Sequence, residues 1–157
     1  MSEKLSHIND DGKAHMVDVS DRAITQRSAR ASAKVVLNKS VLSLIAEGKT
    51  PKGDVLATAR IAGVMGAKKT PELIPLCHPI SISSVNVDLE IVEDGVNIFS
   101  TVTISDRTGV EMEALTAVSI AALTIIDMTK ALDPGATIKN IQVDEKDGGR
   151  NGHWKRT

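Results

Sequence analysis

Aromatic residues are nearly absent from this chain of 157 residues, which has no tyrosine, one phenylalanine and one tryptophan. Modules that bind single-stranded nucleic acid stack bases on exposed aromatic side chains, so a protein of that class is not expected. An excess of charge of one sign is lacking too, because the formal net charge is -1. With no overall basic field to attract nucleic acid or an anionic membrane, any anion site must be local.

Cysteine is also scarce, since Cys77 is the only one in the chain. It can form no internal disulfide, and no Cys-Cys pair exists for a structural zinc site. No spacing of His, Cys, Asp or Glu matches a standard metal motif, so we expect no metal. The polar stretch from Met1 to Met16 lacks the apolar core of a secretory signal. These absences together predict a cytoplasmic protein.

The composition that remains is that of a globular protein, with 41% apolar and 25% charged residues. Residues 1–18 are mostly polar, so we expect a flexible N-terminal segment. Residues 19–157 are long enough for a single domain with its own core. Its end, from Gly148 onward, mixes glycines with basic residues and predicts a flexible tail.

Hydrophobic periodicity and capping signals predict the secondary structure. The expected elements are a strand over 30–37, a helix capped by Asn38 and stopped by Gly48, a helix over 54–69 broken by Thr70-Pro71, hairpin strands over 85–91 and 96–105 with an Asp94-Gly95 turn, a helix opened by a Thr108–Glu111 capping box and ending near Leu132, and a strand over 138–143. Ala31 and Ala33 would also suit a helix in the first of these. The order predicts an α+β, ferredoxin-like split β-α-β fold with a four-stranded antiparallel sheet and one added helix.

The last helix has no charged residue between positions 114 and 126. A helix that is apolar on nearly every side must be buried all round, and this one is shorter than the roughly 20 residues that span a bilayer. Burial by the sheet on one side and by another subunit on the other predicts a homo-oligomer.

The acidic residues of this helix are widely separated. Glu113 and Asp127 point within about 40° of each other, yet they lie roughly 21 Å apart along the axis. One helix cannot bring both to the same substrate atom. If both act in catalysis, either they serve distant ends of a ligand or a neighbouring subunit completes the site.

Each candidate residue also has an ordinary structural interpretation. Asp127 and Lys130 could act as an acid/base and a phosphate partner, or form a surface ion pair. Glu111 and Glu113 could serve only the helix N-terminus. His78 could be an acid, a base or a buried structural histidine, and Cys77 is interpreted as a lining residue rather than a nucleophile. Local positive charge for an anion could come from Lys52, Lys68, Lys69, Arg27, Lys130 and Lys146.

Several strings taken together resemble the molybdenum cofactor biosynthesis protein C family. They are Lys52-Gly53-Asp54, Leu73-Ile74-Pro75-Leu76-Cys77-His78-Pro79, Thr108-Gly109-Val110-Glu111-Met112-Glu113-Ala114-Leu115 and Asp127-Met128-Thr129-Lys130. The similarity extends from about His15 to Gly149, which is nearly the whole chain.

The resemblance implies a lyase that converts 3',8-cyclo-7,8-dihydro-GTP, a cyclised dihydro-GTP, into cyclic pyranopterin monophosphate with release of pyrophosphate. It implies no redox cofactor. It also implies a ferredoxin-like subunit in a hexamer of three dimers, with the active site at the dimer interface.

Carried over residue by residue, the resemblance makes Asp127 the acid/base centre, with Lys52 and Lys130 beside it. The substrate-contacting segments correspond to Leu76, Cys77, His78, Met112 and Glu113, and the supporting candidates are Glu111, Arg27, Lys68, Lys69 and Lys146. One departure is the string Gly148-Gly149-Arg150-Asn151-Gly152, where a Lys-Ser pair is expected between the glycines.

Two other classes of function remain open on the sequence. A non-catalytic ferredoxin-like regulatory oligomer could bind a nucleotide at a subunit interface without turning it over, and it would not need Asp127 and Lys130 together. A purely structural assembly subunit would tolerate the loss of Asp127 or Lys52.

Overall fold

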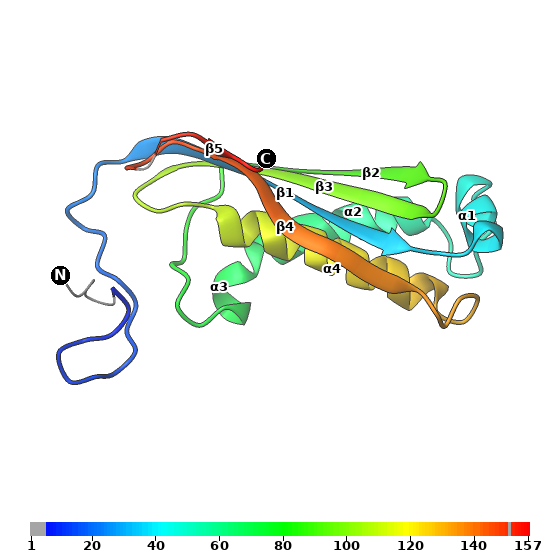
Figure 1. The fold of residues 1–157 in the computed structure, drawn as a ribbon, viewed down its shortest axis with the longest axis horizontal. Helices are drawn as coiled ribbons and strands as arrows, with labels where there is room; N and C mark the ends of the chain where they lie inside the picture. Colours follow the sequence, from blue (N-terminus) through cyan, green and yellow to red (C-terminus); the bar gives the residue numbers. More distant parts are fainter. Residues whose placement is uncertain (1–5, 151) are drawn as a thin grey trace.

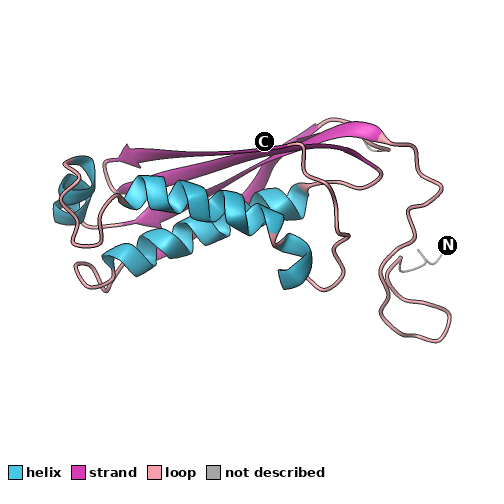
Figure 2. Ribbon diagram, turned by 180° about the vertical axis from the view of Figure 1, so that it is seen from behind, coloured by secondary structure: helices cyan, strands magenta, loops and turns pink. Residues whose placement is uncertain are grey.

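The antiparallel sheet forms one layer of the computed structural model, which describes residues 6–150 and 152–157. Its strand order is β2-β3-β1-β4-β5, and the helices cover one face of it (Figures 1 and 2). The elements are β1 Thr25–Val36, α1 Lys39–Ala46, α2 Val55–Lys68, α3 Thr70–Leu73, β2 Ser84–Val92, β3 Gly95–Asp106, α4 Glu111–Thr129, β4 Thr137–Asp147 and β5 Trp154–Lys155. This confirms the predicted α+β, ferredoxin-like plan.

The prediction of four strands is wrong, because the described part of the chain contains a fifth. β5 pairs with β4 through only two residue pairs, Glu145 with Lys155 and Lys146 with Trp154. A strand of two residues is too short to show an alternating pattern. β1 also begins at Thr25 rather than at position 30. Residues 25–28 are all polar, so they show no alternation of apolar and polar residues that would predict a strand.

Helix capping explains where α1 and α2 begin. The side chains of Asn38 and Asp54 accept hydrogen bonds from the N–H groups of Val41 and Ala57, as predicted. The Thr108–Glu111 capping box is wrong, because Val110 occupies the N-cap of α4 and no side chain caps it. The carboxylate of Glu111 is used elsewhere, as described below.

Two helix ends also differ from the prediction. α4 ends at Thr129, three residues before Leu132, where the N–H groups of Leu132 and Asp133 both donate to the carbonyl of Thr129. After α2, Pro71 lies in the first turn of the short helix α3, which begins at Thr70, because proline is compatible with the first turn of a helix.

The centre of the helical layer is the contact between α2 and α4, which lie side by side in Figure 2. Gly63 and Gly66 of α2 allow this approach: a Cβ atom at Gly66 would lie 2.7 Å from Cγ1 of Ile120. By length and composition alone α4 could cross a membrane, but 56% of its most apolar 18-residue window is buried inside this fold. Leu123 of α4 and Ile61 of α2 remain 55% and 62% exposed.

Candidate active site

The C-terminal end of α4 carries one group of predicted site residues, which we call the Asp127 cluster and define as Lys52, Asp127 and Lys130. The ammonium group of Lys130 donates to Oδ1 of Asp127 at 2.7 Å. The ammonium group of Lys52, from the loop before α2, donates to Oδ2 at 2.9 Å and to the backbone oxygen of Asp127 at 3.0 Å. Two lysines from distant segments therefore converge on one carboxylate.

The two lysines control the ionisation of Asp127. The hydrogen bond from Lys130 and then that from Lys52 lower the pKa of Asp127 from 3.8 to about 2. All three side chains are about half exposed. An exposed pair three residues apart would be an ordinary surface ion pair, but the second lysine makes this a cluster that the fold assembles.

The N-terminal end of α4 forms the other group around a cavity of about 240 Å³, which we call the His78 cavity. The loop that follows α3 supplies His78, whose Nε2 donates to the backbone oxygen of Val17 at 2.7 Å. The residues that line the His78 cavity are Ser6, His7, Val17, Val19, Arg22, Leu76, Cys77, His78, Thr108, Gly109, Glu111, Met112 and Glu113. The cavity thus unites the two segments that the sequence assigns to the substrate.

Glu113 is a buried carboxyl at this cavity, with only 3% of its surface exposed. Burial is the main cause that raises its pKa above the usual value of 4.5, and the negative charge of Glu111 adds to it. The carboxylate of Glu113 accepts a hydrogen bond from its own backbone N–H, which partly offsets the rise in pKa, and within the described residues it forms no ion pair. An acceptor of this kind suits a ligand that brings its own N–H donors.

Cys77 lines the same cavity but is not activated as a nucleophile. Burial raises the pKa of its thiol above 9.0, and the charge of Glu113 raises it further. The thiol is therefore protonated at neutral pH, whereas the thiolate is the reactive form.

The thiol is accordingly dispensable in our account. We expect Cys77→Ser to keep kcat within about tenfold of the wild-type value, because the replacement preserves a small lining group. Steady-state assays of the purified variant check this. A loss comparable to that of removing a nucleophile, about a thousandfold or more, would show that the sulfur takes part in the chemistry.

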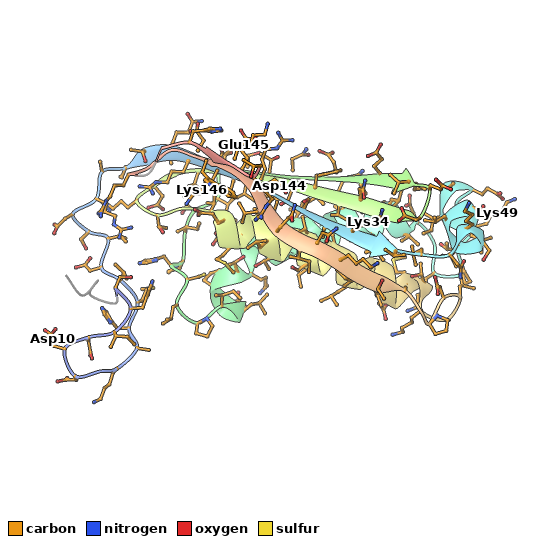
Figure 3. The ribbon with its side chains drawn as sticks, viewed as in Figure 1. Asp10, Lys34, Lys49, Asp144, Glu145 and Lys146 are labelled. Atoms are coloured by element: carbon orange, nitrogen blue, oxygen red, sulfur yellow. The ribbon has the colours of Figure 1, made fainter. Side chains whose placement is uncertain are left out.

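A second cavity of about 230 Å³ adjoins the His78 cavity, and we call it the cationic cavity. It is lined by Arg22, Arg27, Ser28, Gly109, Glu111, Lys146, Asp147, Gly148 and Arg150, so it shares Arg22, Gly109 and Glu111 with its neighbour. Lys146 forms an ion pair with Glu111 at 3.0 Å, which is the contact that replaces the predicted capping box. Figure 3 shows Lys146 in the C-terminal half of β4.

Arg22 belongs to both cavities, yet sequence reasoning missed it. It lies in the irregular segment before β1, where only its charge distinguishes it. Its backbone oxygen accepts a hydrogen bond from Nε of Arg107 at 3.0 Å, which fixes the segment against the loop before α4. Arg27, which was predicted, is held by hydrogen bonds from its Nε to Thr25 and to the backbone oxygen of Asp106.

The two remaining lysine candidates have different positions. Lys68 lines a third cavity of about 450 Å³ whose wall also includes Glu113. Lys69 forms an ion pair with Glu72 at 3.1 Å and lines none of these three cavities. In the string 148–152, which differs from the pattern that the resemblance implies, Arg150 lies at the cationic cavity, while Asn151 is outside the described residues.

A single subunit keeps the two groups of site residues apart. The Asp127 cluster lies at the C-terminal end of α4, whereas Gly109 and Glu111, which line both the His78 and the cationic cavity, lie at its N-terminal end. Figure 1 shows α4 as a single helix along the sheet. α4 is one continuous helix of 19 residues, so the separation of roughly 21 Å expected for Glu113 and Asp127 is built into it. Among the residues that the structure describes, no group of three metal-ligating side chains occurs.

Comparison with known proteins finds close relatives over nearly the full chain. The chain is 57% identical to the cyclic pyranopterin monophosphate synthase of Streptomyces avermitilis over 99% of its own length and 91% of that protein. It is 53% identical to the synthase of a Nocardioides species, over 98% and 96% of the two chains. It is also 56% identical to cyclic pyranopterin monophosphate synthase 3 of Mycobacterium tuberculosis, over 97% and 86%. The MoaC family model matches residues 16–149, and the chain therefore belongs to the MoaC family.

Proposed function

We propose that this protein is a cyclic pyranopterin monophosphate synthase of molybdenum cofactor biosynthesis. It is a lyase that converts 3',8-cyclo-7,8-dihydro-GTP into cyclic pyranopterin monophosphate and releases pyrophosphate. The observation that carries this proposal is that more than half of the residues match those of named synthases over almost the entire chain. A cytoplasmic location fits a substrate derived from GTP.

The cavities at the start of α4 suit the two halves of such a substrate. The cationic cavity offers guanidinium and ammonium groups for the polyphosphate, which Arg binds in a bidentate manner. The His78 cavity offers the buried carboxylate of Glu113, which can accept hydrogen bonds from the N–H groups of a guanine-derived ring. The ring then lies beside His78 and Met112.

The Asp127 cluster provides the groups for proton transfer. With a pKa of about 2, Asp127 is ionised at neutral pH and cannot itself donate a proton in this arrangement. It positions the ammonium groups of Lys52 and Lys130, and these are the donors that opening and rebuilding the ring require. Once a lysine has given up its proton, the same group can act as a base.

Catalysis at one substrate then requires two subunits. In a dimer with two-fold symmetry, the end of α4 in one subunit can face the start of α4 in the other. The exposed apolar side chains Ile61, Met65 and Leu123 of the helical layer support burial against other copies. We propose a hexamer built as a trimer of dimers, in which Asp127, Lys52 and Lys130 complete the partner's cavity.

The test is a pyrophosphate assay with purified protein and the cyclised dihydro-GTP. We expect stoichiometric release of pyrophosphate and formation of the cyclic monophosphate, identified by mass spectrometry, and no release from GTP itself. Tight binding of active substrate without pyrophosphate release would support the non-catalytic regulatory oligomer instead.

A further inference from the structure

The cationic cavity carries an excess of positive charge that its own acids do not cancel. Four of its lining side chains are basic, namely those of Arg22, Arg27, Lys146 and Arg150, and two are acidic. One acid, Glu111, is paired with Lys146 at 3.0 Å. Arg150 is exposed, and within the described part of the chain it forms no hydrogen bond or ion pair. Its guanidinium group is therefore available to a ligand.

The backbone conformation of two glycines places Arg150 at this cavity. Gly148 and Gly149 have φ angles of 87° and 75°, in the left-handed region that favours glycine. A Cβ atom at Gly149 would lie 2.6 Å from Nη1 of Arg27, and one at Gly148 would collide with the backbone oxygen of Gln26. The chain thus passes directly over Arg27, and Arg150 follows immediately.

Residues 154–156 are bound to β4 at the edge of the sheet. β5 pairs Trp154 with Lys146, and the N–H and Nε of Arg156 donate to the backbone oxygens of Asp144 and Val143, both at 2.8 Å. The guanidinium group of Arg156 lies 5.5 Å from the centre of the Trp154 ring. In Figure 1, β5 runs beside β4, and Lys146, the partner of Trp154 in this pairing, lines the cationic cavity. In sequence, Arg150 therefore lies between glycines that pack on Arg27 and residues that are bound to β4.

We propose that Arg150 is a polyphosphate-binding residue of the cationic cavity, which it lines together with Arg27. The inference rests on the proposed function for the identity of the substrate, but it requires only that the ligand carry linked phosphates. A guanidinium group with no protein partner, beside three other basic side chains, presents the fork of donors that phosphate oxygens accept.

The probe for this inference is inorganic tripolyphosphate, which carries the phosphates without the ring. Binding is measured by calorimetry at physiological salt and by the fluorescence of Trp154, which is the only tryptophan in a chain without tyrosine. We expect Arg150→Ala to weaken tripolyphosphate binding about tenfold and Arg150→Lys to weaken it less, because charged hydrogen bonds are lost or reduced.

The matched control is Arg30→Ala, which removes an equal charge from β1, the strand that also carries Arg27. Arg30 is exposed, lies 3.7 Å from Glu145, and is an odd number of residues from Arg27 on β1, so it faces the other side of the sheet. Its loss is expected to leave tripolyphosphate affinity within twofold. Equal losses in the two alanine variants, unchanged binding in Arg150→Ala, or no binding of tripolyphosphate by the wild-type protein would each overturn the inference.

The outcome is separable from that of the proposed function. If the wild-type protein releases pyrophosphate and Arg150→Ala retains the wild-type KM and tripolyphosphate affinity, only the role of Arg150 fails. If the wild-type protein releases none and Arg150→Ala still loses tripolyphosphate binding, the proposed reaction fails and the phosphate site stands.

Discussion

Replacing Asp127 by asparagine is expected to lower kcat for pyrophosphate release by about a thousandfold while the protein remains folded. The change removes the negative charge that holds the ammonium groups of Lys52 and Lys130, at 2.9 and 2.7 Å, in one place. Misplacing proton-transfer groups costs on the order of 10² to 10⁴ in rate. Steady-state kinetics measure the loss, and circular dichroism and light scattering report on the fold and the assembly.

Asp94→Asn is the matched control for this experiment. Asp94 is also an exposed aspartate whose pKa is lowered, mainly by a hydrogen bond from a lysine, Lys34. It lies in the hairpin turn between β2 and β3, and it lines none of the cavities described above. We expect Asp94→Asn to keep wild-type kcat. Full activity in Asp127→Asn, or equal losses in both variants, would remove the Asp127 cluster from the mechanism.

Replacing Glu113 by glutamine is expected to raise thermal stability at pH 7.5 and to impair the enzyme at the same time. The pKa of Glu113 is raised on folding, so between its unfolded and folded values the folded state binds more protons than the unfolded state. The free energy of unfolding therefore falls as the pH rises through that window, and the full cost of the buried charge is present above the folded pKa. Glutamine removes this cost.

The pH dependence of the melting temperature checks this prediction. The gain in Glu113→Gln over the wild type should be largest above the folded-state pKa of Glu113 and should vanish below the unfolded pKa of about 4.5, where both side chains are neutral. KM should rise about tenfold or more, because the ring loses a charged acceptor. Glu72→Gln, at an exposed acid paired with Lys69, is the control and should show no such gain. A lower melting temperature at pH 7.5 would mean that the assembled protein pairs Glu113 with a cation.

Much of the fold is encoded locally and was predictable for that reason. The hairpin of β2 and β3 follows from strict alternation around Asp94-Gly95, and the helices α1 and α2 begin at side chains that cap them. The start of α4 was mispredicted because Glu111 has the spacing of a capping box but pairs with Lys146, 35 residues further along the chain. A contact of that range leaves no local signal.

The site residues also fall into two groups, those that could be predicted from the sequence and those that only long-range pairing brings together. The residues at the two ends of α4 could be named from the sequence, and the separation of Glu113 and Asp127 followed from helix geometry. The cationic cavity could not be predicted from the sequence, because the pairing of Ser28 with Asp147 across β1 and β4 brings Arg27 beside Gly148. Arg22 and Arg150 lie in irregular segments that only this long-range pairing places together.

The account depends most on the claim that one active site is shared by two subunits, and mixing inactive variants tests it directly. Asp127→Asn disrupts the Asp127 cluster at one end of α4, and His78→Ala disrupts the His78 cavity at the other end. Each variant alone should therefore be inactive. If subunits exchange at random within a two-fold dimer, half of the dimers are mixed and each has one intact site, so roughly a quarter of wild-type activity should return. Mixed oligomers, confirmed by mass spectrometry, that remain as inactive as either parent would contradict the shared site.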